Sequence, residues 1–71
     1  MNNKQKLSTA LKVARAKANM KQCDLAKLSG VACITIAKIE AKGNNYMPSV
    51  KTLVALAEAL KINVDTLTKY L

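Results

Sequence analysis

The side chains with the clearest chemical potential are the basic ones, because they greatly outnumber the acidic ones. The chain of 71 residues has 12 basic and 4 acidic side chains, and its formal net charge at pH 7 is +8. This excess favours a polyanionic partner, which for a small helical domain is usually nucleic acid. The alternative is that the charge serves solubility alone. A membrane surface fits less well, because no basic helix face is combined with large Trp, Phe or Leu anchors.

The second chemical feature is the presence of two cysteines, Cys23 and Cys33. They are too few and wrongly spaced for a zinc site, and the chain has no histidine to assist them, so we expect no metal and no cofactor. A structural disulfide is not expected in a cytosolic chain. We expect Cys23 to be a small, half-buried filler and Cys33 to lie exposed at the start of a helix. A redox role for Cys33 is the less favoured alternative.

The residue types that enzymes use are not assembled in this sequence. There is no histidine, there are no paired carboxylates or phosphate-holding glycine loops, and the few Ser and Thr residues have no partner base. We therefore expect no enzymatic activity. No stretch approaches the roughly 20 apolar residues that a membrane span needs, and the polar start has no signal-peptide segment behind it. These features predict a cytoplasmic protein.

The segment that organises the rest of the chain runs from Gln22 to Glu40. Aliphatic residues recur there at helical spacing on both sides of a glycine. They are Leu25 and Leu28 before the glycine, and Ile36 and Ile39 after it. Gly30 accepts a positive φ at little steric cost, which a tight turn between helices often needs. With Ala26 allowing a close helix crossing and Val31 filling the corner, the pattern predicts two helices joined by a turn.

Three further helices are predicted around this segment, because alanine, leucine and lysine favour helices and aromatic residues make up only 3% of the chain. The first covers residues 4–18 and ends near Asn19. Lys21 and Ala32 are poor N-caps for the two central helices, although Asp24 compensates for the first of them. Gly43 is expected to end the helix that follows Ala32. The predicted apolar stripes are Leu7, Leu11, Ala14 and Ala18 in the first helix, Val50, Leu53, Ala57 and Leu60 after the N-cap Ser49, and Val64, Leu67 and Leu71 after the cap Asn63.

The chain resembles the lambda-repressor-like, Cro/C1-type (XRE-like) helix-turn-helix family of small DNA-binding domains. The resemblance covers roughly residues 7–68 and rests on six short matches. They are Gln22-x-x-Leu25-Ala26, Ser29-Gly30-Val31, Thr35-Ile36, Lys38-Ile39-Glu40, Pro48-Ser49 and Leu56-Ala57-x-Ala59-Leu60. The resemblance implies an all-α fold of five helices in a single domain over residues 1–71. The second and third helices would form the motif, and the third would enter the major groove.

The resemblance also implies roles for individual residues. Arg15 and Glu40 correspond to an ion pair that ties the first helix to the end of the third. Gln22 corresponds to a residue whose side chain and backbone amide meet a phosphate at a helix N-terminus. The remaining expected DNA-binding residues are Ala32, Cys33, Ile34, Thr35 and Lys38 in and beside the third helix, and Lys42, Asn44, Asn45 and Tyr46 in the following loop.

Several positions depart from the family pattern. Cys33, Ile34 and Thr35 have little hydrogen-bonding capacity for base readout, so they suit thymine methyl groups, and Lys38 alone is suited to guanine O6 or N7. The loop before Pro48 is one or two residues longer than in common members. Lys61 stands where many members have glycine.

The sequence therefore predicts a regulator that binds specific sequences of double-stranded DNA. The resemblance favours a repressor that acts on an operator as a homodimer, and the apolar end Tyr70-Leu71 suggests dimerisation through the C-terminal helix. The alternative is a protein-interaction module of the antitoxin or antirepressor-bound adaptor type. In that case the partner would be a protein, and Ile34 would serve the protein interface.

Overall fold

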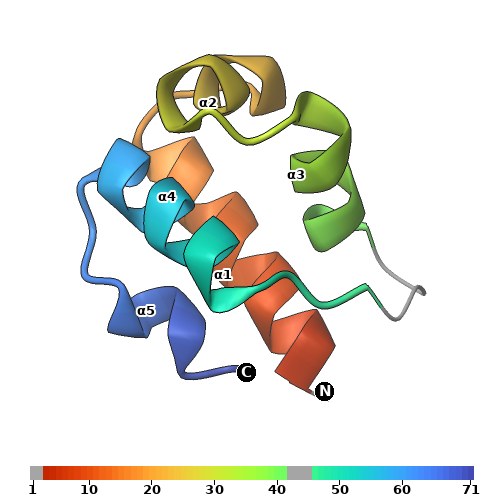
Figure 1. The fold of residues 1–71 in the computed structure, drawn as a ribbon. Helices are drawn as coiled ribbons and strands as arrows, with labels where there is room; N and C mark the ends of the chain where they lie inside the picture. Colours follow the sequence, from red (N-terminus) through yellow and green to blue (C-terminus); the bar gives the residue numbers. More distant parts are fainter. Residues whose placement is uncertain (1–2, 42–45) are drawn as a thin grey trace.

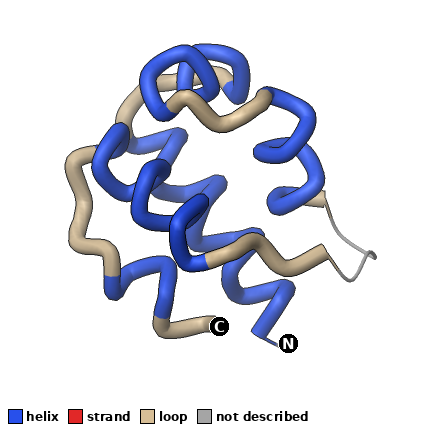
Figure 2. Tube along the Cα trace, viewed as in Figure 1, coloured by secondary structure: helices blue, strands red, loops and turns tan. Residues whose placement is uncertain are grey.

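A computed structural model of the chain describes residues 3–41 and 46–71, and these residues contain five helices (Figure 1). The helices are α1 (Asn3–Lys17), α2 (Gln22–Ser29), α3 (Cys33–Glu40), α4 (Val50–Leu60) and α5 (Asp65–Thr68). Across the described ranges there is no strand, which confirms the predicted all-α class (Figure 2). No described helix has both the length and the apolar character that crossing a membrane requires.

The core lies where one side of each helix meets the others. Helix α1 packs against α3 and α5, while α2 packs against α3 and α4, and α4 also contacts α5 (Figure 1). The buried apolar residues are Leu7, Leu11, Leu25, Ile36, Ile39, Leu53, Leu56, Ala57, Leu60 and Leu67. Burying one such Leu or Ile side chain contributes about 1.5–3 kcal/mol relative to leaving it exposed. Every helix supplies at least one of these residues, so the position of α3 depends on the whole core.

Within the predicted apolar stripes, Ala14, Ala18 and Val64 are half-buried against this core, and three further residues are exposed. Leu28 is 64% exposed, Val50 is 56% exposed and Leu71 follows α5 with 47% exposure. The inward face of α2 is centred on the buried Leu25 and the half-buried Ala26. At about 100° per residue, Leu28 points nearly a third of a turn away from the middle of that face. In α4, Leu56 is buried although it does not belong to the predicted stripe.

The helix ends explain the chain reversals between the elements. Asn19 after α1 and Lys61 after α4 both adopt positive φ, at 58° and 57°. The Ser49 hydroxyl accepts a hydrogen bond from the Thr52 N–H at 3.2 Å, so Ser49 caps α4 as predicted. Helix α3 ends at Glu40, and the predicted role of Gly43 falls on a residue outside the described ranges.

The two weak helix starts differ in their capping. Lys21 offers no side-chain cap to α2, but its backbone N–H donates to the Asp24 carboxylate at 3.0 Å. Ala32 offers no side-chain cap to α3. At the start of α5, the Asn63 side-chain oxygen accepts from the Asp65 N–H at 3.0 Å.

Candidate nucleic-acid interface

Helix α3 has a buried side and an outward side. Ile36, Ile39 and Glu40 face the core and anchor the helix. Ile34 is 67% exposed and Lys38 is exposed as well, while Cys33 and Thr35 are half-buried. Ala32, just before the helix, is exposed. Most of the residues expected to face bases therefore lie at the start of α3. Lys38 lies farther along the helix and is also exposed.

The turn between α2 and α3 is set by backbone geometry. Gly30 has a φ of 77°, and its N–H donates to the Ala26 carbonyl at 2.9 Å. A Cβ built at Gly30 would meet nothing within 4 Å, so the need for glycine here comes from the left-handed backbone and not from crowding. The Val31 N–H donates to the Ser29 hydroxyl at 3.1 Å, and Val31 is half-buried in the corner. These bonds hold α3 in a defined direction relative to α2.

The end of α3 is tied to α1 by a two-pronged ion pair. Arg15 Nε and Nη2 donate to the two carboxylate oxygens of Glu40 at 2.8 and 2.9 Å. Arg15 Nη1 donates to the Met20 carbonyl at 2.8 Å. Glu40 is only 2% exposed, so its charge relies on these donors in place of water. The hydrogen bond to Glu40 raises the pKa of Arg15 above its ordinary value, although partial burial opposes this.

Gln22 also contacts the carboxylate of Glu40. Its side-chain Nε2 donates to Glu40 Oε1 at 3.0 Å, so the side chain expected to meet a phosphate also holds the core carboxylate. The Ser8 hydroxyl donates to the Glu40 backbone carbonyl at 2.7 Å, which adds a second link between α1 and α3. Neither contact was predicted from the sequence. The spacing of Ser8 and Leu11 along one helix face is the only signal that Ser8 turns inward.

Lys38, the lysine expected to contact a base, lies near an aromatic residue of the loop that follows α3. Lys38 Nζ lies 5.9 Å from the centroid of the Tyr46 ring, at the outer limit of a cation–π contact. This contact brings one predicted loop residue beside α3. The other three, Lys42, Asn44 and Asn45, lie outside the described residues.

The structure corrects the expectation for the cysteines. Cys23 is exposed and Cys33 is half-buried, so the prediction that Cys23 is a half-buried filler was wrong. The two Sγ atoms lie 2.6 Å apart, although the residues belong to different helices. Each cysteine stands in the first turn of its helix. The sequence contained both cysteines, but only the crossing of the helices brings them together.

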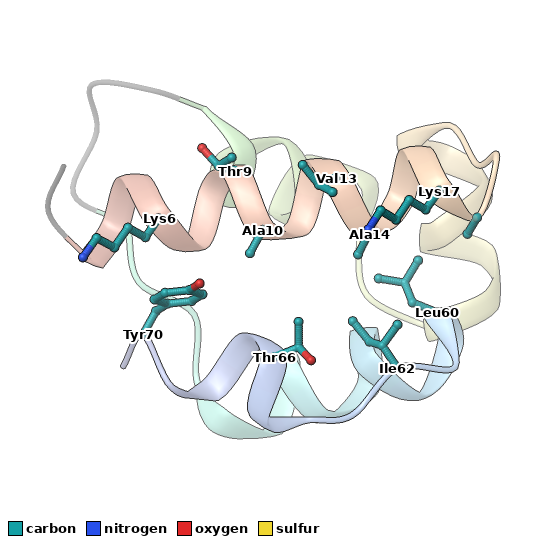
Figure 3. Close-up of a pocket in the computed structure, with 11 residues that line it drawn as sticks. Lys6, Thr9, Ala10, Val13, Ala14, Lys17, Leu60, Ile62, Thr66 and Tyr70 are labelled. Atoms are coloured by element: carbon teal, nitrogen blue, oxygen red, sulfur yellow. The ribbon is translucent and has the colours of Figure 1, made fainter.

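A separate apolar groove lies between α1 and α5, away from α3. Its volume is about 560 Å³. The side chains along it include Ala10, Val13 and Ala14 from α1, Leu60 and Ile62 from the end of α4 and beyond, and Tyr70 near the C-terminus (Figure 3). Lys6 and Lys17 stand at its two ends (Figure 3). Within the described ranges no group of three or more potential metal ligands occurs.

The family comparison agrees with this geometry. The family model described as helix-turn-helix matches residues 5–67, which include α2, the Gly30 turn and α3. Neither a comparison with curated proteins nor one with solved structures finds a match.

Proposed function

Since the chain belongs to the Cro/C1-type helix-turn-helix family, a family of DNA-binding regulators and not of enzymes, we propose that it represses transcription by occupying an operator as a homodimer. The observation that carries this proposal is the two-sidedness of α3. Its inner side is fixed by Ile36, Ile39 and Glu40, so its outer side is a rigid surface for the major groove. Bound protein would cover the promoter, and repression would follow from that occupancy.

Phosphate contacts would set the register of the protein on DNA. The backbone N–H of Gln22 is the first of α2, where unpaired donors and the helix dipole favour an anion. The Gln22 side chain remains committed to Glu40 through one N–H, so the phosphate contact would couple to the buried cluster. Lys42 would contribute positive charge, and the other loop residues expected to meet phosphates would contribute hydrogen-bond donors, in both cases without base identity.

Base readout would come from the exposed part of α3. Ile34 presents an apolar side chain suited to the thymine methyl group, and Cys33 and Thr35 add small groups beside it. Lys38 would donate to guanine O6 or N7, with its approach guided by the Tyr46 ring. We therefore expect half-sites that contain adjacent thymines with a guanine nearby.

The dimer would form through the α1–α5 groove. Val13 lines this groove and is 45% exposed, so an apolar side chain remains accessible on this side of the molecule. Figure 1 shows α5 and α3 at separate places on the fold, so pairing through α5 leaves α3 open to DNA. Two such subunits would present their recognition helices to half-sites about one helical turn apart.

The decisive experiment is selection of bound sites from a random DNA pool, followed by gel shifts with the selected site. We expect Lys38→Ala to weaken binding and to relax the preference at one base pair, at a loss of about 1–3 kcal/mol. Lys61→Ala is the matched control, because it makes the same replacement at a lysine that follows the end of α4, which Figure 1 shows away from α3. If selection enriches no sequence, the operator-binding proposal fails.

The second candidate function is a protein-interaction module, and exposed apolar side chains favour it. Ile34 and Leu28 are the two most exposed large apolar residues among those described. In this case Ile34→Ala would abolish binding of a protein partner and would leave affinity for DNA unchanged. A loss of DNA affinity in Ile34→Ala, measured by gel shift, would instead assign the side chain to the groove.

A further inference from the structure

We propose that Cys23 and Cys33 form a reversible intramolecular disulfide that links α2 to α3. The two thiols are the only cysteines in the chain, and their sulfurs already lie 2.6 Å apart. A disulfide bond has an S–S length of about 2.05 Å, so closing it requires only a small movement. The proposal depends on the positions of the thiols and holds whether or not the protein binds an operator.

The surroundings of the two thiols predict the order in which they react with an oxidant. Cys23 is exposed, so an oxidant reaches it from solvent. Cys33 is half-buried, and its hydrogen bond with Cys23 raises the pKa of the Cys33 thiol above its ordinary value. Cys33 is therefore less accessible than Cys23 to an oxidant in solution. Cys23 is therefore the thiol that reacts first, and Cys33 is the thiol that resolves the product.

Hydrogen peroxide is the oxidant class that fits this order. The Cys23 sulfur attacks one peroxide oxygen, the O–O bond breaks, and the departing hydroxide takes up the thiol proton as water. The product is a sulfenic acid on Cys23. The Cys33 sulfur then attacks the sulfenic sulfur, the S–O bond breaks, and hydroxide leaves with the Cys33 proton as a second water. Overall, two thiols lose two electrons and one peroxide is reduced to two waters, and a dithiol reductant reverses the change.

The bond would brace the helix-turn-helix. It closes a loop that contains Gly30, the residue on which the direction of α3 depends. Cross-links of this size restrict the unfolded chain, and for a domain of this length the expected rise in melting temperature is roughly 10–20 °C. Since the thiols are neighbours before oxidation, α2 and α3 keep their arrangement.

The test uses the purified full chain, treated with hydrogen peroxide and then freed of it. We expect a mass decrease of about 2 Da, loss of both free thiols, a peptide that joins residues 23 and 33, and a higher melting temperature that dithiothreitol reverses. Cys23→Ser and Cys33→Ser should each show none of the reversible stabilisation. These single variants also show whether either cysteine is needed for folding in the reduced state.

A matched positional control keeps the number of thiols constant. In Cys33→Ser/Ala32→Cys the second thiol moves by one residue to the exposed N-cap position of α3. We expect its internal bridge to form at least about tenfold more slowly, because disulfide geometry tolerates little misplacement. Oxidation of the natural sequence to covalent dimers, or a mass gain of about 32 Da without an internal bridge, would overturn the proposal.

Discussion

Glu40 is the residue on which the placement of α3 most depends. Its carboxylate is buried and receives three hydrogen bonds, two from Arg15 and one from Gln22. A buried charge is tolerated only when such donors replace water. Removing one of these side chains leaves the remaining buried groups without a hydrogen-bond partner. The stability lost on truncation is therefore larger than the net stability that the Arg15–Glu40 ion pair contributes.

Arg15→Ala and Glu40→Ala should each lower the free energy of unfolding by about 3–5 kcal/mol, because each leaves partners of a largely buried pair uncompensated. The double variant should lose less than the sum of the two single losses. Thermal and urea unfolding measure all three values. Lys17→Ala on the exposed part of α1 is the control, with an expected change within about 0.5 kcal/mol. Strict additivity would show that Arg15 and Glu40 are not energetically coupled.

The sequence predicted parts of this residue cluster and not others. The resemblance implied that Arg15 meets Glu40, and the structure contains this ion pair. It did not imply the Gln22 side-chain bond to Glu40 or the approach of Cys23 to Cys33. Helical spacing reports which residues share a face, whereas these contacts depend on how two helices cross. That crossing is decided by the packing of the whole core.

At the scale of helices, the predicted elements are confirmed where local and tertiary preferences agree. The predicted first helix, 4–18, differs from α1 by one residue at each end. Asn19 adopts the left-handed conformation that its position after the helix indicated. Leu28 and Val50 show where periodicity alone misleads, since neither apolar side chain faces a neighbouring helix closely enough to be buried.

The end of α4 offers a test of backbone strain. Lys61 has φ 57° and ψ 41°, a conformation that costs a residue with a Cβ about 1–2 kcal/mol. Lys61→Gly should therefore raise the free energy of unfolding by about 0.5–1 kcal/mol after the added entropy of the unfolded glycine is counted. Lys51→Gly is the matched control, because Lys51 is exposed within α4 and should lose about 1 kcal/mol. Chemical unfolding measures both variants. If Lys61→Gly lowers the free energy of unfolding as Lys51→Gly does, this account of Lys61 is wrong.

The apolar part of α3 allows a test of readout. Replacing thymines by uracils in the selected half-site removes methyl groups and keeps the hydrogen-bonding pattern. We expect a loss of about 1 kcal/mol for each methyl that contacts Ile34 or its neighbours, near the value for burying one methylene. Gel-shift titration with the same substitution outside the half-site is the control. Equal affinity of the thymine and uracil half-sites would remove Ile34 from the base-reading set.

At the scale of the whole molecule, the net charge of +8 acts in opposite directions on DNA binding and on self-association. Binding to DNA releases counterions, so salt weakens it. Two free subunits repel each other, so salt screens the repulsion and strengthens their pairing. These opposite salt dependences distinguish the two processes in one protein.

We expect affinity for DNA to fall roughly 10³-fold between about 50 and about 200 mM salt if about six phosphates are neutralised. Fluorescence anisotropy with a selected duplex measures the slope. Lys42→Ala should weaken all sequences about equally and make the slope shallower by about one unit. A nearly flat response to salt would argue against phosphate contacts.

Dimerisation through the α1–α5 groove should be weak without DNA and stronger at higher salt. Sedimentation with and without a palindromic duplex measures the state. Val13→Lys places another charge beside the groove and should prevent pairing, whereas Val50→Lys changes a similarly exposed valine outside the groove. One subunit bound per palindrome at saturation would exclude the dimer.

The separation of anchoring and exposed residues along α3 has a consequence for how such a protein can diverge. Ile34 makes no contribution to the buried core, whereas Ile36 and Ile39 two and five positions later are fully buried. Substitutions at Ile34 and at the half-buried Thr35 can therefore change the preferred target with little effect on folding. A library randomised at these two positions should consist mostly of folded proteins, whereas one randomised at Ile36 and Ile39 should not. New binding preferences can arise on this scaffold without compensating changes elsewhere in the chain.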